Sequence, residues 1–347
     1  MVRVECGFPP HYYSQEELID ALKEFWAEKV FNLERLEQFH RNVLVEGRHL
    51  ALAREQYREL KGFGDRNTAW IEVATELATE VVGRLLERSG CSPEQLGLFA
   101  FTTVTGLAVP SLEARLMNRL PLPRSLRRMP LFGLGCLAGA AGVARAADSL
   151  AAYPDKAAIM LAVELCSLTL QAEDFSVANL VASGLFGDGA AAALLVGDEH
   201  PLAGQGPRVL ATASDFYPDS ERVMGWDITD NGFKIVLANN VPDYARHQVA
   251  DGVRAFLGEQ GLAIEDIGWW ITHPGGPKVM SSLCEGLGLP DEALELSRQS
   301  LARVGNMSSA SVLFILDEVM RQAKPGDYGL LMAMGPAFCS ELVLLRW

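Results

Sequence analysis

The chain has 347 residues, of which 49% are hydrophobic and 21% are charged, so it is long enough for a sizeable core and more than one domain. Its formal net charge of −14 argues against nucleic acid and anionic membrane surfaces as partners, and an anionic substrate would need a local basic patch. Six cysteines without a CxxC pair argue against a disulfide scaffold and a metal site. No signal-peptide layout or membrane-length apolar run is present, so we expect a cytoplasmic protein with no membrane insertion.

The N-terminal part of the chain is expected to be mainly helical. Ser14 and Glu17 fit a capping box ahead of an apolar stripe, which predicts that a helix begins there. A stretch rich in Arg and Glu over 32–60 is expected to form a second, largely solvated helix. An apolar stripe over 68–89 predicts a third helix.

From residue 98 onward, apolar strands alternate with helices. The strands are expected at 98–105, 129–134, 157–164 and 190–196, with a short helix at 111–120 and a helix of small residues after Cys136. Such alternation is typical of α/β folds and predicts mostly parallel sheets.

The second part of the chain repeats the first. Residues 86–102 resemble 257–273, and each segment reads as a helix end, a capped turn and a buried strand. The same offset brings Cys136 next to Asn306, and both precede helices of small residues. We therefore expect two similar α/β halves, residues 1–200 and 201–347. Packed face to face, they would place Cys136 and Asn306 at a common cavity.

Cys136 stands at a junction between a strand, a glycine turn and a helix. The first turn of a helix has unpaired N–H groups and the positive end of the helix dipole, which stabilise a thiolate. Cysteines in such positions can titrate at roughly 3.5–7.5. This placement favours a nucleophile, while a small buried hydrophobic residue is the alternative.

His273 ends a predicted buried strand, at the edge where α/β folds bind ligands, and a Pro-Gly-Gly-Pro turn follows it. A histidine satisfied within the core is the alternative. Together with Cys136 and Asn306, it suggests either a papain-like hydrolase or a decarboxylative condensing enzyme. In the second chemistry, His and Asn both donate to a thioester oxygen, as in an oxyanion hole. The duplicated layout fits this second chemistry.

The sequence resembles the type III polyketide synthases, the chalcone synthase-like family of the thiolase superfamily, and within it the bacterial branch that makes alkylpyrones and alkylresorcinols. The motifs that carry the resemblance follow the family's order along nearly the whole chain. They are Phe132-Gly-Leu-Gly-Cys-Leu-Ala-Gly, Glu164-Leu-Cys-Ser-Leu-Thr, Leu185-Phe-Gly-Asp-Gly-Ala-Ala-Ala, His273-Pro-Gly-Gly-Pro, Gly305-Asn-Met-Ser-Ser-Ala-Ser and Met334-Gly-Pro.

The resemblance implies a thiolase-like α/β fold, two pseudo-repeated halves in α-β-α-β-α layers. It implies that Cys136 carries starter and growing chain as thioesters. His273 would keep that sulfur as thiolate and help decarboxylation, and Asn306 would be the second donor to the thioester and enolate oxygen.

Other positions are implied to contact the substrate, with ordinary core packing as the alternative. Phe186 resembles a gatekeeper ring, and Ile235 falls near the second gatekeeper, a Phe in plant enzymes. The remaining cavity positions are Cys166, Leu168, Thr169, Trp226 and Ser308. The family's lysines for the CoA phosphates are not evident, so Arg35 and Arg41 are candidates, although most charges on that helix are expected to be solvated.

The expected function is therefore condensation of an acyl-CoA starter, of the long fatty-acyl kind, with malonyl-CoA, followed by cyclisation to an alkylpyrone or alkylresorcinol. CoA thioesters are the only small molecules implied, without a further cofactor, and the family is typically homodimeric. A single-condensation β-ketoacyl-acyl carrier protein synthase III is the alternative enzyme. A thiolase-fold scaffold without activity is the alternative outside catalysis.

Overall fold

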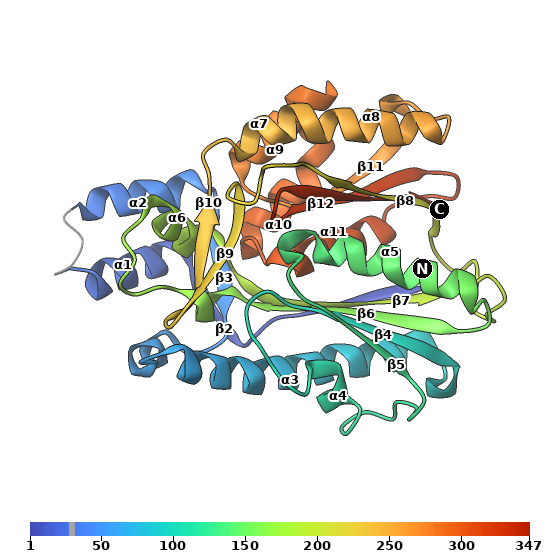
Figure 1. Cartoon of the computed structure of the whole chain (residues 1–347), viewed down its shortest axis with the longest axis horizontal. Helices are drawn as coiled ribbons and strands as arrows, with labels where there is room; N and C mark the ends of the chain where they lie inside the picture. The colour runs from blue at the N-terminus through green and yellow to red at the C-terminus, as the bar shows by residue number, and fades with distance from the viewer. Residues whose placement is uncertain (28–31) are drawn as a thin grey trace.

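The computed structural model describes residues 1–27 and 32–347, which form five layers (Figure 1). Two sheets are separated by a middle layer of helices that contains α5 (Ala138–Ala152) and α11 (Ser311–Met320). Helix α3 (Phe63–Ser89) covers the outer face of one sheet, and α8 (Ala250–Glu259) and α9 (Pro277–Leu287) cover the other. The expected α-β-α-β-α layering is confirmed.

Four strands of each sheet share one topology, which confirms the predicted repeat, and the first sheet has β5 as an additional edge strand. The first has the order β1-β7-β6-β4-β5, and the second β11-β12-β13-β8. In each, a parallel pair (β4/β6 or β11/β12) is followed by an antiparallel neighbour (β7 or β13). The strands are β1 (Arg3–Gly7), β4 (Leu96–Thr102), β5 (Arg127–Leu131), β6 (Ala157–Leu165), β7 (Asp188–Val196), β8 (Arg208–Phe216), β11 (Ile267–Thr272), β12 (Tyr328–Gly335) and β13 (Cys339–Arg346).

The prediction of mostly parallel sheets is wrong, because both sheets are mixed. Between β12 and β13 only residues 336–338 intervene, and so short a connection can only form a hairpin, which pairs antiparallel. Strands β7 and β1 add two further antiparallel pairings in the first sheet.

The N-terminal region differs in part from the predicted helices. Helix α1 (Gln15–Phe25) begins at the predicted capping box of Ser14 and Glu17. The single helix expected over 32–60 is instead α2 (Leu33–Asn42), strand β3 (Gly47–Leu50) and a 3₁₀ turn η1 (Arg54–Glu59). Strand β3 forms because it pairs with β2 (His11–Ser14), a tertiary contact that helical propensity cannot foresee. The helical expectation over 28–31 lies outside the described residues.

Glycines allow the two halves to approach closely in the middle layer. A Cβ built on Gly139 of α5 would lie 2.1 Å from the carbonyl oxygen of Ser309, in the other half of the chain. The small residues of α5 therefore pack directly against the turn before α11, in a core that joins both sheets. Only small residues leave room for so close an approach of the two halves.

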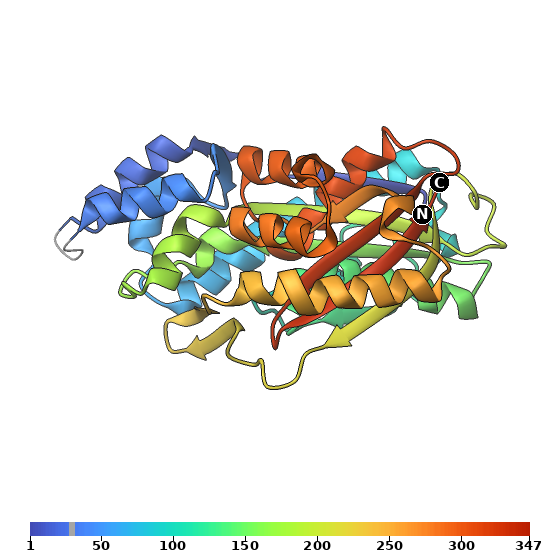
Figure 2. The ribbon, with the colours of Figure 1, turned by 90° about the horizontal axis from the view of Figure 1, so that it is seen from above.

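One end of the molecule projects beyond the layers, as Figures 1 and 2 show. It carries α1, α2, α6 (Val177–Leu185) and the hairpin of β9 (Met224–Thr229) and β10 (Gly232–Leu237). No helix in the described part of the chain is long and apolar enough to cross a bilayer. The remaining helices are α4 (Leu112–Leu116), α7 (Val241–Tyr244) and α10 (Glu295–Val304).

Candidate active site

Cys136 lies in a 3₁₀ turn, η3 (Gly135–Leu137), that leads directly into α5. The residue before it, Gly135, has a φ of 53°, and a Cβ there would lie 2.5 Å from Cδ of Pro336. Only glycine fits both conditions without strain. The turn that presents the thiol is thereby packed against the link between β12 and β13 of the other half.

Asn306 is held by backbone pairing with the segment that carries Phe186. Its N–H donates to Leu185 O at 2.9 Å, and its carbonyl accepts from Gly187 N at 3.0 Å. Its side-chain Oδ1 accepts from Ser308 N at 2.8 Å, which directs the amide nitrogen the other way, toward His273.

His273 follows β11, at the predicted strand end, and its backbone N–H donates to Met332 O at 2.9 Å. Its Nε2 lies 3.4 Å from Nδ2 of Asn306. When Nε2 carries the imidazole proton, these two nitrogens form neighbouring donors, and one oxygen atom can accept from both. The predicted His–Asn pair is thus brought together, as the geometry of an oxyanion site requires.

The thiol of Cys136 accepts a hydrogen bond from Oγ of Ser308 at 3.3 Å. Ser308 has a φ of 48°, in the left-handed region that few non-glycine residues adopt. The strained backbone is held by the hydrogen bond from Ser308 N to Oδ1 of Asn306. One turn therefore positions both the hydroxyl of Ser308 and the side-chain amide of Asn306.

Burial disfavours an isolated charge on either Cys136 or His273. It raises the pKa of the Cys136 thiol to about 12, against a smaller lowering by the Ser308 hydrogen bond, and it lowers the pKa of His273 to about 4. The low thiol pKa expected from the helix start is therefore wrong for this site, because burial raises the pKa by more than the neighbouring groups lower it. Transfer of the thiol proton to the imidazole would create two opposite charges together, whose attraction is strong in a buried site.

Cys136, His273 and Asn306 line one cavity of about 940 Å³. Of the predicted substrate-contacting positions, five also line it: Cys166, Phe186, Trp226, Ile235 and Ser308. Trp226 and Ile235 are cross-strand partners in the β9–β10 hairpin, which explains why they occur together. Leu168 was predicted to line the cavity but is buried in the core under α3, in accord with the core-packing alternative.

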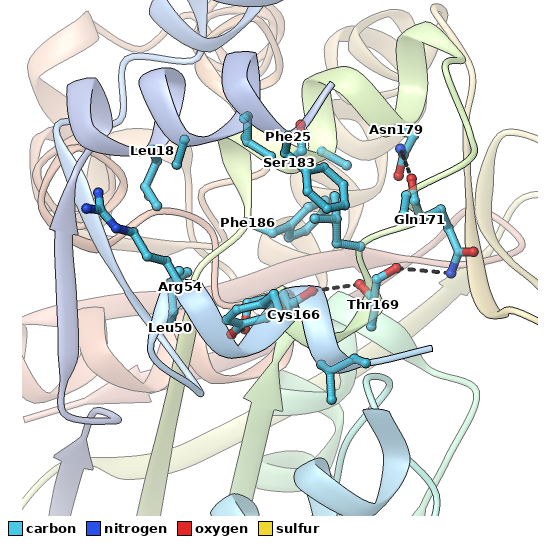
Figure 3. Close-up of a pocket in the computed structure, with 18 of the residues that line it drawn as sticks. Leu18, Phe25, Leu50, Arg54, Cys166, Thr169, Gln171, Asn179, Ser183 and Phe186 are labelled. Atoms are coloured by element: carbon cyan, nitrogen blue, oxygen red, sulfur yellow. Dashed lines mark hydrogen bonds between the residues drawn. The ribbon is translucent and has the colours of Figure 1, made fainter. Parts of the chain in front are cut away.

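A second cavity of about 730 Å³ adjoins the first, and Figure 3 shows part of its lining. Cys166, Phe186, Trp226 and Ile235 line both cavities. Thr169 lines the second one, together with Arg48, Tyr57 and Gln171, which the sequence analysis did not single out. Arg48 belongs to a segment expected to be helical and solvated, so no sequence signal pointed to a buried cavity position.

The arginines predicted to bind CoA lie on α2, which contributes Phe39 and Asn42 to the wall of the Cys136 cavity. Arg41 pairs with Glu16 and Glu37, and Arg35 lies over the ring of Phe39, 5.2 Å from its centroid. Neither lines either cavity. Among the described residues that line the Cys136 cavity, Lys278 is the only Lys or Arg. Lys278 directly follows the Pro-Gly-Gly-Pro turn after His273, and this proximity could have identified it from the sequence as a candidate for the site.

Two buried carboxyl groups hold the cavity walls. Asp188 accepts from Ala51 N at 2.6 Å and Ser167 N at 2.8 Å, so it anchors its turn. Glu164 accepts from Thr105 Oγ1 at 2.9 Å, and also from Val104 N and Ser309. Burial raises the pKa of each carboxyl to about 7.

Comparison with known proteins gives consistent matches along the chain. Residues 1–199 match the N-terminal domain of the chalcone and stilbene synthases, and residues 208–347 match their C-terminal domain. A 1,3,6,8-tetrahydroxynaphthalene synthase from Streptomyces peucetius subsp. caesius is 46% identical over 347 residues, covering 99% of this chain and 92% of the relative. A phloroglucinol synthase from Pseudomonas fluorescens is 30% identical, covering 98% of this chain and 97% of the relative.

Among solved structures, the crystal structure of 1,3,6,8-tetrahydroxynaphthalene synthase from Streptomyces coelicolor A3(2) is similar with a TM-score of 0.94. That protein, described as a bacterial type III polyketide synthase, is 30% identical to this chain. The match covers 100% of this chain and 98% of the solved one.

Proposed function

This chain belongs to the chalcone and stilbene synthase family and is a type III polyketide synthase, and we propose that it builds its product on Cys136 by repeated decarboxylative condensation with malonyl-CoA. The observation that carries the assignment of the site is the convergence of Cys136, His273 and Asn306 in one cavity. Each comes from a separate segment, and the two halves of the repeat supply them together.

In the loading step, His273 takes the thiol proton and Sγ of Cys136 attacks the thioester carbonyl of the starter. The bond between that carbonyl carbon and the CoA sulfur breaks, CoA leaves as a thiolate that takes its proton from solvent, and His273 keeps the thiol proton on Nε2. The hydrogen bond from Ser308 stabilises the thiolate between these events. The chain is then held as a thioester on Cys136.

In the extension step, malonyl-CoA loses carbon dioxide, and the electron pair of the broken C–C bond becomes an enolate. The enolate oxygen accepts from Nε2 of His273 and Nδ2 of Asn306, which lie 3.4 Å apart. The enolate carbon attacks the thioester carbonyl on Cys136, and the thiolate leaves. The chain is now two carbons longer and is attached to CoA, from which it returns to Cys136 for the next round.

For the product, we propose malonyl-CoA as both starter and extender, giving a polyhydroxylated aromatic compound of the tetrahydroxynaphthalene type. The support is the 46% identity to a 1,3,6,8-tetrahydroxynaphthalene synthase over nearly the whole chain. The polar lining of the second cavity, with Arg48, Tyr57 and Gln171, suits a chain rich in oxygen atoms.

A long fatty-acyl starter leading to an alkylpyrone or alkylresorcinol is the second candidate. The observation that favours it is the apolar lining that Val177, Val181 and Leu185 of α6 contribute to the Cys136 cavity, together with Val236 and Leu237 of β10. Product analysis by mass spectrometry separates the two candidates.

In that experiment, purified protein receives malonyl-CoA alone or with a series of acyl-CoA starters from acetyl to stearoyl. A hydroxylated naphthalene from malonyl-CoA alone supports the first candidate, and pyrones or resorcinols with an alkyl chain support the second. Condensation only on malonyl-acyl carrier protein, ending after one step, would refute both in favour of the single-condensation alternative. Cys136→Ala is the control, because loss of the nucleophile should abolish every product.

Binding of CoA is proposed to use Lys278 at the wall of the Cys136 cavity, since a cation is needed to hold phosphate against the net charge of −14. We keep the other sequence-based expectations as proposals: CoA thioesters without a further cofactor, a homodimer, and a location in the cytoplasm.

A further inference from the structure

The second cavity is a separate chamber that adjoins the catalytic one. Cys136, His273 and Asn306 do not line it, but the wall of Cys166, Phe186, Trp226 and Ile235 is common to both cavities. The two cavities are therefore in contact along this wall. A group that passes this wall from Cys136 therefore enters the second cavity directly.

The lining of this cavity is basic in a strongly acidic protein. The cavity is lined by five cationic residues and four acidic ones, although the chain as a whole has a net charge of −14. The cationic residues are Arg48, Arg54, Arg58, Lys61 and Arg66, and the acidic residues are Asp20, Glu24, Glu55 and Glu173. Arg54 and Arg58 pair with Glu55 and Glu24 at the rim. In the described part of the chain, no carboxylate forms an ion pair with Arg48 or Arg66.

These two arginines stand in different surroundings. Arg48 is fully buried and donates to the carbonyl oxygens of Ser183 and Gly184 and to Gln15. Burial lowers its pKa to about 10, so it is still charged at neutral pH. Arg66 donates to Asn231 O at 3.2 Å, in the turn of the β9–β10 hairpin, and partial burial lowers its pKa as well. The carboxylates of Asp188 and Asp65 raise the pKa of Arg48 and Arg66 in turn, against the effect of burial, and an anionic ligand in the cavity would add a direct, hydrogen-bonded ion pair.

The chemistry of the growing chain supplies such an ion. A chain that starts from malonyl carries a carboxylate at its far end until that group is lost, and its enolised carbonyls add negative charge. A chain that starts from a fatty acyl group ends in a neutral alkyl tail. The cationic residues of the lining would stabilise a carboxylate at the end of the chain, whereas a neutral alkyl tail would leave their charges without a partner.

We propose that the second cavity binds the far end of the growing chain through its anionic group, and that Arg48 and Arg66 thereby select malonyl-primed over alkyl-primed chains. This inference rests on the proposed function, because it requires a chain that grows on Cys136. It assigns the charged lining a role in the choice of starter, apart from the chemistry at the sulfur.

The first test fills the cavity with one side chain. Ala182 and Ala178 lie one turn apart on α6; Ala182 lines the second cavity and Ala178 the catalytic one. Ala182→Leu should shift the products of malonyl-CoA to shorter chains. The matched control, Ala178→Leu, should slow CoA release without that shift.

The second test removes the charge. In competition between malonyl-CoA alone and malonyl-CoA with hexanoyl-CoA, Arg66→Gln should lower the ratio of malonyl-primed to hexanoyl-primed product by about tenfold, since a hydrogen bond to a charged group is lost. Arg66→Lys should keep most of the ratio. Arg119→Gln, which removes a surface arginine that pairs with Glu76 away from both cavities, is the control.

The outcomes separate this inference from the function on which it rests. If the wild-type protein makes no malonyl-primed product, the proposed function is wrong. If it makes that product, but Arg66→Gln leaves the starter ratio and Ala182→Leu leaves the chain length unchanged, the second cavity does not hold the chain end and the inference is overturned.

Discussion

Removal of the Ser308 hydroxyl should make Cys136 less reactive. That hydroxyl donates to Sγ of Cys136 at 3.3 Å and lowers its pKa against the effect of burial. A hydrogen bond to a charged group is worth about 1.5–3 kcal/mol. One pKa unit corresponds to about 1.4 kcal/mol, so the thiol pKa should rise by about one to two units in Ser308→Ala.

Below its pKa, the thiolate fraction falls about tenfold for each unit by which the pKa rises, so alkylation of Cys136 by iodoacetamide at pH 7 should slow by about 10- to 100-fold. The assay is the rate of Cys136 modification, followed by peptide mass spectrometry over a range of pH. The rate profile of the variant should be displaced to higher pH.

The strained backbone of Ser308 allows a second variant to isolate the hydroxyl. At a φ of 48°, glycine is relaxed and alanine is not, so Ser308→Gly and Ser308→Ala both lack the hydroxyl but differ in strain. Both should react equally slowly. Ser340→Ala, at a buried serine of β13 bonded to Tyr217, is the control and should react like wild type. Alkylation of both Ser308 variants at the wild-type rate would refute the reasoning.

Three further predictions concern the neighbouring groups. Asn306→Ala removes one of two donors to the enolate and should slow carbon dioxide release from malonyl-CoA by about 10²–10³-fold, measured with labelled substrate. Lys278→Ala should raise the KM for malonyl-CoA about three- to tenfold, as one phosphate contact is lost, with kcat unchanged; Lys324→Ala, at a surface turn, should change neither. Burial raises the pKa of Glu164 from 4.5 to about 7. Between these two pH values the folded protein keeps a proton that the unfolded chain releases, so the free energy of unfolding falls as the pH rises from 4.5 to 7. In urea titrations, Glu164→Gln should therefore gain about 3 kcal/mol relative to wild type between pH 4.5 and 7, and a pH-independent difference would contradict this assignment.

Prediction from the sequence succeeded where one pattern occurs twice. Cys136 and Asn306 both precede helices of small residues, and the repeat predicts that they meet at one cavity, which both residues line in the structure. His273 could be found in the same way, because a strand end before a rigid turn is a local signal. These features depend on hydrophobic period and turn chemistry, which a single chain displays directly.

Prediction failed where structure depends on partners distant along the chain. Strand β3 lies in a charge-rich stretch and exists because β2 pairs with it. The second cavity is assembled from α1, the turn η1, α6 and the β9–β10 hairpin, and no local pattern connects these segments. For the same reason Arg48 was missed, since its burial is decided by the carbonyl groups of Ser183 and Gly184 that it meets.

The charge state of the site could not be predicted from position alone. A helix start favours a thiolate, but the depth of burial of Cys136 acts in the opposite direction and is the larger effect on its pKa. Burial depth is a property of the assembled halves. The sequence therefore predicts a nucleophile at Cys136, whereas the surroundings that set its pKa, the hydroxyl of Ser308 among them, arise only in the folded protein.

The most direct test of the account is the mass of the protein itself during turnover. Wild-type protein is incubated with malonyl-CoA, quenched in acid, digested and mapped by mass spectrometry. We predict acyl adducts on the peptide that contains Cys136, in a series that grows by two-carbon ketide units, and no such series in Cys136→Ala. Product formation without adducts on Cys136, or with the series on Cys166 instead, would contradict the account.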